Sequence, residues 1–316
     1  MQALEAGLPA YFGERELPGI DTVELHPSAH RTSFPLEEVQ VTLVDGRRAA
    51  LLRKTVSRSS LSANAAAAKR EECFDARREV AVYRELLARA GLGTARLVAA
   101  DGTPDGSAVW MLLEHVRGVE MYQVGAIETW RAAAAWLAAM HERLAWAAAD
   151  GPASRARLLT QGPDVWRLSI QRALGSGHAT LPAHTRDRLA ASRGTVIAML
   201  ESMPVRVLHG DAYASNIVVD DALAPHRVCA VDWEMASRGP ALLDLAALTS
   251  GSWSETAASV IADGYVDALP PSSPWRDDRR AFQTALAACR AQLAVQWIGR
   301  HPAWLPPPDA LDRLEL

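Results

Sequence analysis

The chain has 316 residues, a hydrophobic fraction of 49% and a charged fraction of 22%, proportions that are ordinary for a globular protein and exclude the disordered and fibrous classes. This length predicts one large domain or two lobes, because a single hydrophobic core stops growing at roughly 250–300 residues. The net charge of −4 gives no electrostatic reason to expect a polyanionic partner, so we expect no nucleic-acid binding.

The cysteines and the apolar runs indicate the compartment. Cys73, Cys229 and Cys289 are far apart and odd in number, which fits neither a disulfide framework nor a metal site with close ligand pairs. No stretch approaches the ~18 uninterrupted apolar residues of a membrane span, and acidic residues precede any apolar run of signal-peptide length. We therefore expect reduced thiols and a cytoplasmic protein without a membrane partner.

The first third of the chain predicts a small antiparallel sheet with one helix. Residues 21–26 and 38–44 have the β-branched pattern of strands, Asp45-Gly46 supplies a hairpin turn, and residues 49–56 form the return strand. Residues 64–90 are rich in Ala, Arg, Glu and Leu, which predicts a helix that stops at the following glycines. Strand character returns at residues 97–98 and 108–113.

Beyond Gly118 the composition predicts a larger, mostly helical part. Alanine-rich helical runs cover residues 125–149, 183–202, 253–268 and 276–299. We therefore expect an α+β, two-lobed chain with an N-terminal lobe at 1–113, a hinge at 114–118 and a helical C-terminal lobe at 119–316. Two apolar, β-branched stretches, 205–219 and 228–231, interrupt the helical lobe, and the polar residues beside them are the best place for chemistry.

The central motif is the run His-Gly-Asp-Ala-Tyr-Ala-Ser-Asn at 209–216, followed 16 residues after its last residue by Asp232. Phosphoryl transfer needs a carboxylate to accept the acceptor's proton and oxygen ligands for magnesium. Asp211 suits the first role, and Asn216 and Asp232 suit the second. Any one of these residues alone would be read as part of a turn or cap, but the combination with flanking strands favours a catalytic site.

With the segments 231–234 and 239–246, this motif resembles the aminoglycoside phosphotransferase family, also called the choline-kinase-like or antibiotic-kinase group. The resemblance covers nearly the whole chain in element order and is strong over about 205–248. It implies a protein-kinase-like fold, Asp211 as catalytic base and Asn216 and Asp232 as magnesium ligands. It also implies that Asp244, together with His209, supports the catalytic loop without touching substrate.

A kinase-like fold also requires a lysine on the third strand that holds the nucleotide phosphates and a helical glutamate that fixes this lysine. Lys54 and Glu79 fit these positions. Arg53 competes with Lys54 by one strand register, and two further glutamates, Glu71 and Glu72, precede Glu79. An exposed surface ion pair is the alternative for both residues.

The resemblance also implies a nucleotide site formed by the backbone. The hinge would contact a purine through the Glu114 carbonyl and the Val116 amide, and the sequence does not separate ATP from GTP. A glycine-rich loop is absent, and residues 27–33 occupy the corresponding turn, where Ser28 and Thr32 are candidates for phosphate contacts. A simple surface turn is the alternative there.

The sequence says less about the site that would bind the phosphate acceptor than about the nucleotide site. Tyr213 stands where many members of the family carry histidine, and either shapes the acceptor site or packs. His141 resembles a recurrent family histidine, but we interpret it as a satisfied internal contact. Most of the ten tryptophans are expected in the core, with Trp253 or Trp297 as candidates for lining an acceptor pocket.

The predicted function is therefore phosphotransfer from a nucleoside triphosphate, with magnesium, to a hydroxyl of a small molecule. The acceptor is an antibiotic, which would give resistance, or a metabolic or natural-product intermediate. Aminoglycosides would favour an acidic acceptor pocket, whereas the tryptophan-rich lobe makes a less cationic, partly apolar acceptor equally plausible. The alternatives are a non-catalytic nucleotide sensor, which predicts a lost base or ligand, and a protein kinase, which predicts a glycine-rich loop.

Overall fold

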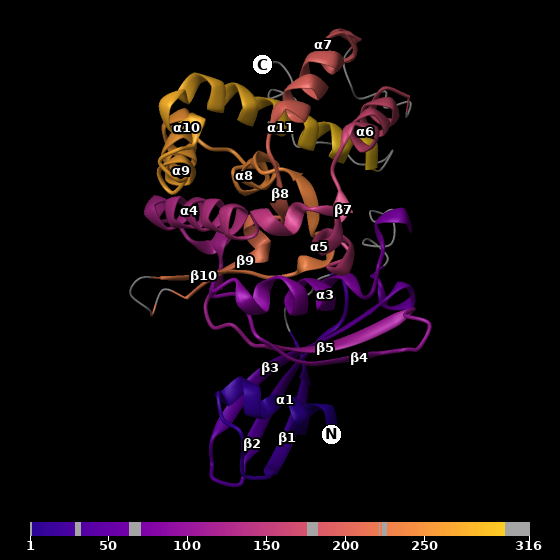
Figure 1. Cartoon of the computed structure of the whole chain (residues 1–316), viewed down its shortest axis with the longest axis vertical. Coiled ribbons are helices and arrows are strands. Elements are labelled where there is room, and N and C mark those ends of the chain that lie inside the picture. Colours follow the sequence, from indigo (N-terminus) through magenta and orange to yellow (C-terminus); the bar gives the residue numbers. More distant parts are fainter. Residues whose placement is uncertain are drawn as a thin grey trace.

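The computed structural model describes residues 2–28, 33–62, 71–175, 183–220, 222 and 226–300. The chain forms an N-terminal part built on one sheet and a larger helical part, stacked along the long axis of the molecule (Figure 1). The expected α+β, two-lobed class is therefore confirmed, while the lobe and hinge boundaries at 113, 114–118 and 119 stay a prediction. None of the helices within the described ranges is long and apolar enough to cross a bilayer.

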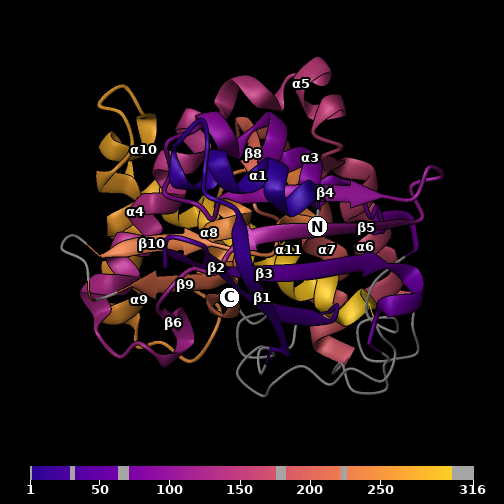
Figure 2. The same cartoon turned by 90° about the horizontal axis from the view of Figure 1, so that it is seen from below.

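The N-terminal sheet has five antiparallel strands in the order β1-β2-β3-β5-β4. Figure 2 shows this sheet in front of the helical part. The strands are β1 (Ile20–Pro27), β2 (Leu36–Leu43), β3 (Arg48–Ser57), β4 (Leu97–Gly102) and β5 (Ala108–Glu114). All five were expected from the sequence, because half-buried strands show the alternation of apolar and polar residues that period-2 patterning detects.

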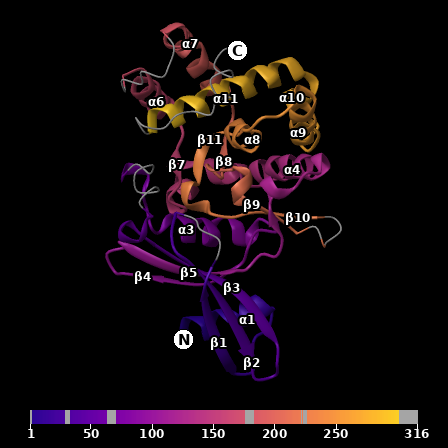
Figure 3. The ribbon, with the colours of Figure 1, turned by 180° about the vertical axis from the view of Figure 1, so that it is seen from behind.

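Helices cover both faces of this sheet. Helix α1 (Gln2–Phe12) buries Leu4 and Leu8 against side chains that include Leu51 and Leu112. The opposite face, with Met111 and Leu113, belongs to the main core that α3 (Arg78–Glu85) shares with the helical part. Figures 1 and 3 both show α3 between the sheet and the helices of the C-terminal part. Successive residues of β5 thus point to different cores, as pleating requires.

The predicted helix at 64–90 is wrong in extent. Residues 63–70 lie outside the described part, and from residue 71 the chain forms a 3-10 turn (Glu71–Cys73), the short α3 and a second 3-10 turn (Leu87–Arg89). The Asp75 carboxylate accepts the Arg77 N–H at 3.0 Å, and this local bond competes with helical backbone bonding. Because of this turn, the helix begins only after Arg77.

The C-terminal part consists of helices around two small sheets, β10-β9-β6 and β7-β11-β8. Its helices are α4 (Ile127–Arg143), α5 (Asp150–Arg155), α6 (Pro163–Gly175), α7 (Ala183–Ser202), α8 (Leu242–Leu248), α9 (Glu255–Asp267), α10 (Pro274–Asp277) and α11 (Arg279–Arg300). Its strands are β6 (Val119–Glu120), β7 (Leu159–Thr160), β8 (Val205–Leu208), β9 (Ile217–Asp220), β10 (Arg227–Ala230) and β11 (Ser237–Pro240).

The four predicted helical runs correspond to helices of this part. The run at 183–202 coincides with α7, and the run at 276–299 covers the end of α10 and nearly all of α11. The sequence did not predict α1, α5, α6 and α8. Helix α8 is buried along its whole length, so its residues carry no polar stripe by which a helical period could be recognised.

Candidate active site

The run at 209–216 connects β8 to β9 and turns once through a 3-10 segment, Ala214–Asn216. Gly210 in this loop has φ of 80°, and a Cβ at this position would lie 2.0 Å from the Met235 carbonyl oxygen. Only glycine fits both the left-handed backbone and the close approach. The loop is therefore pressed against the segment that follows Asp232.

His209 links the two loops that carry the candidate catalytic residues. Its ring is fully buried, and Nε2 lies 2.9 Å from the carbonyl oxygen of Val231. A carbonyl can only accept, so Nε2 carries the proton and Nδ1 accepts the Asp211 N–H at 3.3 Å. A neutral His209 ring thus lies between the backbone at Asp211 and the backbone beside Asp232 and is hydrogen-bonded to both.

Asp244, in the first turn of α8, binds the backbone of the same loop. Its Oδ2 accepts the His209 N–H at 2.7 Å, and its Oδ1 accepts the Gly210 N–H at 3.0 Å. The Asp244 side chain is only 2% exposed. Backbone N–H groups bonded to a buried carboxylate are held in fixed directions, so Asp244 orients the peptide units directly before Asp211.

A buried chain of hydrogen bonds extends this support. His141 Nε2 lies 3.1 Å from Asp244 Oδ2, and His141 Nδ1 lies 2.9 Å from the Tyr265 hydroxyl. Because the carboxylate accepts, a neutral His141 carries its proton on Nε2 and accepts the Tyr265 O–H at Nδ1. Burial raises the pKa of Tyr265 well above its usual value, so this phenol stays a donor. The His141 ring makes the internal contacts expected of it, whereas Tyr265, 124 residues away, had no sequence signal.

Replacing Asp244 by Asn is expected to lower the free energy of unfolding by about 1–3 kcal/mol, because the amide group of Asn points a donor at a buried backbone N–H that loses its acceptor. Urea denaturation followed by circular dichroism measures this change. The matched control is Asp263→Asn on α9, whose exposed pair with Arg279 should cost less than about 1 kcal/mol. An equal loss in both variants would contradict the supporting role.

Asn216 closes the loop onto Asp211. Its Nδ2 donates to the Asp211 carbonyl oxygen at 2.8 Å and to the Asp211 carboxylate oxygen Oδ2 at 3.0 Å. The amide nitrogen is therefore committed to Asp211, and the amide oxygen is the atom of Asn216 that can ligate a hard cation.

Lys54 lies at the centre of a buried charged cluster. Its Nζ is 2.6 Å from Glu79 Oε2 and 2.5 Å from Asp232 Oδ1, and its side chain is 4% exposed. Burial by itself would lower the pKa of Lys54, but the carboxylates of Asp232 and Glu79 outweigh burial and raise it. Burial raises the pKa of Glu79, and the Lys54 ammonium opposes that rise. The cluster holds two carboxylates against one ammonium, a balance that suits an added cation.

The pleat of β3 separates Lys54 from its competitor. Lys54 lies on the face of the sheet that meets α3, whereas Arg53 pairs with Glu37 at 3.1 Å and both of these side chains are more than a third exposed. Among the competing acidic residues, Glu71 makes an exposed pair with Arg58 at 3.6 Å. The side chain of Glu72 lies outside the described part. Of the candidates whose side chains are described, Lys54 binds Asp232 directly and Glu79 binds Lys54.

Asp232 has a backbone conformation that marks its position. It lies in the left-handed region with φ of 66° and ψ of 62°, and it begins the 3-10 turn Trp233–Met235. A non-glycine residue there costs about 1–2 kcal/mol, and such residues concentrate at functional sites. The next N–H, of Trp233, donates to Glu79 Oε1 at 3.3 Å, so Glu79 holds both Lys54 and the Asp232 turn.

Arg78 is a residue that the sequence did not indicate. It is 4% exposed and donates to the carbonyl oxygens of Cys73, Arg157 and Glu234 at 2.8, 2.8 and 2.7 Å. These bonds attach the start of α3 to the segment after Asp232. Because Glu79 is the next residue, Arg78 fixes where Glu79 enters the cluster. A buried arginine before an acidic residue has no pattern that sequence analysis recognises.

The hinge candidates occupy the end of the sheet. The Glu114 carboxylate binds Arg227 at 2.6 and 3.1 Å, and this pair outweighs burial and lowers the pKa of Glu114. The neighbouring His115 N–H donates to the Ala50 carbonyl oxygen at 3.0 Å. Within the described ranges no backbone carbonyl accepts the Val116 N–H, so the amide that is expected to meet a purine is not committed to the sheet.

The candidate phosphate turn is only partly described. The Ser28 hydroxyl donates to Glu38 Oε1 at 3.2 Å and its N–H donates to the Leu36 carbonyl oxygen at 3.0 Å. Thr32 lies outside the described residues. The phosphate role of this turn stays a prediction.

Two aromatic pairs involve the tryptophans that are candidates for the acceptor pocket. Trp297 Nε1 donates to the Tyr213 hydroxyl, and their ring centroids are 5.8 Å apart. Trp253 packs edge-on against Trp130 with centroids 4.6 Å apart. Trp297 is thus in contact with a residue two positions after Asp211, which fits its candidacy for the acceptor pocket.

Metal binding would fall to the oxygens of Asp232 and Asn216. Across the described residues there is no group of three or more His, Cys, Asp or Glu side chains that could form a metal cage. Magnesium needs few protein ligands because it keeps water and phosphate oxygens in its remaining positions. One carboxylate and one amide oxygen are the hard donors that it prefers, so these residues fit it.

Comparison with known proteins decides the family. The model of the phosphotransferase enzyme family known as APH matches residues 41–282, which is more than half of the chain. The chain belongs to this family. The matched range spans Lys54, Glu79 and the whole 205–248 region. The chain is therefore a phosphotransferase, and the predicted family is confirmed. No curated protein sequence matches it.

Solved structures agree on the fold at low identity. The structure of the microcompartment-associated aminopropanol kinase is 13% identical, with a TM-score of 0.61 and coverage of 93% of this chain and 89% of that one. The GDP complex of wild-type aminoglycoside 2'-phosphotransferase-IIIa is 13% identical, with a TM-score of 0.58 and coverage of 98% and 95%. Plasmodium vivax ethanolamine kinase is 11% identical, with a TM-score of 0.58 and coverage of 93% and 82%.

Proposed function

We propose that this phosphotransferase moves the terminal phosphoryl group of a nucleoside triphosphate, ATP or GTP, to a hydroxyl of a small molecule. The observation that carries the proposal is the cluster of Lys54, Glu79 and Asp232, linked through His209 to the loop that bears Asp211 and Asn216. Solved structures of this fold include the GDP complex of an aminoglycoside phosphotransferase and kinases named for ethanolamine and aminopropanol. These names support a nucleotide donor and a small hydroxylated acceptor.

Each residue of the cluster has a defined role in the proposed reaction. Asp211 accepts the proton of the acceptor hydroxyl as its oxygen bonds to phosphorus and the nucleoside diphosphate leaves. Lys54, positioned by Glu79, binds phosphate oxygens. Asn216 and Asp232 would hold magnesium, which when bound neutralises negative charge on the phosphates. Most of the acceleration comes from positioning and charge stabilisation, as expected for a loose transition state.

The remaining assignments follow from this mechanism. Residues 1–113 would bind the nucleotide phosphates, the 114–118 hinge would contact the base through the Glu114 carbonyl and the Val116 amide, and residues 119–316 would bind the acceptor. We propose a cytoplasmic enzyme that uses neither nucleic acid nor membrane as partner. Antibiotic inactivation and the phosphorylation of a metabolic intermediate would both use this machinery, because the site specifies the reaction and not its purpose.

The proposed function is tested by nucleotide turnover against a panel of hydroxylated antibiotics and metabolites. We expect ADP or GDP release that an acceptor accelerates and that EDTA abolishes, with phosphorylated acceptor detected by mass spectrometry. Nucleotide binding that is unaffected by EDTA, without turnover for any acceptor, would instead indicate a non-catalytic nucleotide-binding protein.

A further inference from the structure

A pocket of about 1180 Å³ lies among α7, α9 and α11. Ligand pockets have volumes of roughly 300–1,000 Å³ and walls that are mostly apolar with a few polar groups. The lining here includes Leu189, Val196, Met199, Trp253 and Val295. The volume is somewhat above this range, so the pocket has room for a small organic ligand, and its lining suits one.

The walls of this pocket continue into elements that hold the Asp211 loop. Helix α8, whose first turn bears Asp244, ends at Leu248, and the pocket is lined by the residues that follow, including Thr249 and Trp253. On the other side α11 supplies Val295, and Trp297, two residues later, donates to the Tyr213 hydroxyl. The pocket is therefore flanked on two sides by segments that touch the loop with the proposed base.

Gln292 contributes buried polar atoms without a hydrogen-bond partner to this pocket. The side chain lines the pocket and is 1% exposed, and neither its amide oxygen nor its amide nitrogen has a partner among the described residues. The indole nitrogen of Trp253 is likewise without a partner there. An unpaired buried amide costs about 1–3 kcal/mol, and such groups call for an explanation. A ligand that pairs with the amide supplies one.

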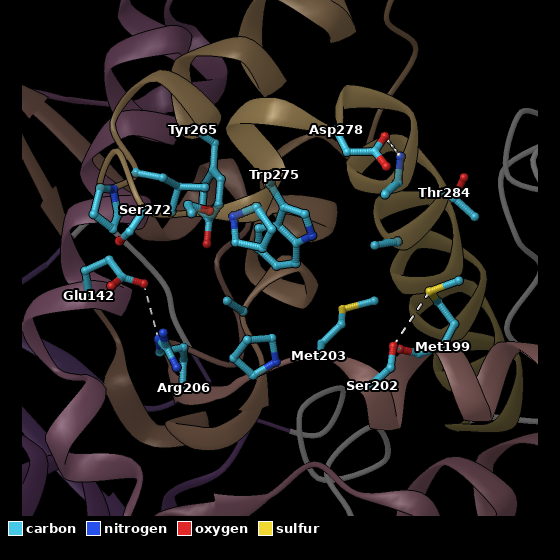
Figure 4. A pocket seen from close by; sticks show the side chains of 18 of the residues that line it. Glu142, Met199, Ser202, Met203, Arg206, Tyr265, Ser272, Trp275, Asp278 and Thr284 are labelled. Carbon is cyan, nitrogen blue, oxygen red and sulfur yellow. Dashed lines mark hydrogen bonds and ion pairs between the residues drawn. The ribbon is translucent and has the colours of Figure 1, made fainter.

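A neighbouring pocket of about 710 Å³ makes no such demand. Figure 4 shows it with Trp275 at its centre. Its polar side chains have partners: Arg206 pairs with Glu142 at 3.3 Å, as Figure 4 shows. The Ser202 hydroxyl donates to the Met199 carbonyl oxygen at 2.7 Å and lies 3.9 Å from the Met199 sulfur, the contact drawn in Figure 4. The Tyr265 hydroxyl is bonded to His141. Unmet polar groups therefore distinguish the larger pocket.

The charged residues that line the larger pocket indicate the charge of its ligand. Its described lining carries three arginines, Arg188, Arg193 and Arg290, against a single acid, Glu255. Arg290 is the most enclosed of the three and donates to the Thr249 hydroxyl at 3.1 Å. Like charges disfavour a cationic ligand and opposite charges favour an anionic one. A polycation would meet three guanidinium groups in this pocket.

We propose that this pocket binds the acceptor, and that the acceptor is a partly apolar, neutral or anionic hydroxyl compound and not a polycation. The proposal rests on the proposed phosphotransfer and names the substrate class of the same site. The apolar body of the acceptor packs on the walls near Trp253, its amide-like or hydroxyl groups pair with Gln292, and an acidic group is bound by Arg290.

Three hydroxylated probes that differ in charge test the substrate class: p-nitrophenyl β-D-glucuronide, p-nitrophenyl β-D-glucoside and kanamycin. Isothermal titration calorimetry should show that both aryl glycosides bind more tightly than kanamycin, with the glucuronide tightest. Arg290→Ala should weaken glucuronide binding about tenfold or more and leave glucoside binding unchanged, because only the charged ligand loses a charge-assisted hydrogen bond. Arg280→Ala, on the same helix but beside the other pocket, is the matched control and should change neither.

Gln292→Leu separates a binding role from a structural one. Leucine removes the unpaired amide, so the variant should have a higher Tm than the wild type while it binds both aryl glycosides about tenfold more weakly. A residue that only packs would lower stability and affinity together, or affect neither. Unchanged glycoside binding in this variant would overturn the role of Gln292.

These experiments distinguish failure of the proposed substrate class from failure of the proposed phosphotransfer. If the glycosides bind in the expected order but none of the probes is phosphorylated, the substrate class stands and the phosphotransfer to this pocket fails. If kanamycin binds and is phosphorylated as well as the glucuronide, phosphotransfer stands and the substrate class is overturned. Failure of both glycosides to bind would also overturn it.

Discussion

Replacing Asp211 by Asn should lower kcat by about 10²–10⁴-fold, the usual contribution of a general base. The amide of Asn cannot accept the acceptor's proton, but it has nearly the same shape as the carboxylate. Its oxygen can keep the hydrogen bond from Asn216 Nδ2, which in the wild type joins the two side chains at 3.0 Å. The loop should therefore keep its conformation, and ADP affinity should stay within about twofold of wild type, because uniform binding is untouched.

The measurement is steady-state turnover with the best acceptor, alongside ADP titration and a thermal melt. Asp220→Asn is the matched control, because Asp220 ends β9 on the same polypeptide segment and its carboxylate accepts only a local bond from the Ala222 N–H at 3.1 Å in the described residues. Its turnover should match wild type. If Asp211→Asn kept more than about a tenth of wild-type kcat, the base would have to be another residue.

The sequence predicted the parts of the candidate site that are close together along the chain. It missed the residues that come together only in the folded structure. The 209–216 run and Asp232 are recognisable because catalytic loops are short and keep their spacing when they are held between strands. Lys54 was preferred in the sequence with Arg53 as a competitor, since the choice depends on which face of β3 meets α3, and the structure supplies that face. Arg78 and Tyr265 act through backbone carbonyls and a buried histidine, partners that leave no local pattern.

The same dependence on local patterns explains which elements of the fold were predicted correctly. Strands such as β2 were predicted because Val39, Val41 and Leu43 alternate with half-exposed residues, which is a local signature of a one-sided sheet. The helix predicted at 64–90 is too long because composition alone does not register a turn such as the one at Asp75. Alanine-rich stretches favour helix through propensity, but side-chain bonds to the backbone override so weak a preference.

Replacing Lys54 by Met is expected to cause the largest loss of stability of any single substitution in the nucleotide site. Removing one partner of a buried ion pair costs about 3–5 kcal/mol, because the remaining charge keeps its desolvation penalty without its partner. Here the penalty falls on two carboxylates, since Glu79 and Asp232 both lie within 2.6 Å of Nζ. Urea denaturation at pH 8 measures the loss, and phosphotransfer should fall by about 10²–10³-fold because a charge on the phosphates is no longer stabilised.

Arg53→Met is the matched control. Arg53 precedes Lys54 on the same strand and loses a pair with Glu37 whose side chains are 39% and 40% exposed, so its cost should be less than about 1 kcal/mol. A second control adds Glu79→Gln to Lys54→Met. Neutralising one of the two stranded carboxylates should recover part of the lost stability, which would not happen if the single substitution caused only a packing defect in β3.

The pH dependence of stability tests the charge interaction of Lys54 independently. The pKa of Lys54 is raised in the folded protein, so in the wild type its contribution is complete below about pH 10 and is lost only as pH rises through the folded pKa. Without the ammonium, burial raises the pKa of Glu79 further, and an acid whose pKa is raised by folding stabilises the folded state as pH falls. The stability deficit of Lys54→Met relative to wild type should therefore shrink between about pH 8 and pH 5. A deficit that stays constant over this range would show that the lost stability comes from packing, and that Lys54 does not hold the two carboxylates together by charge.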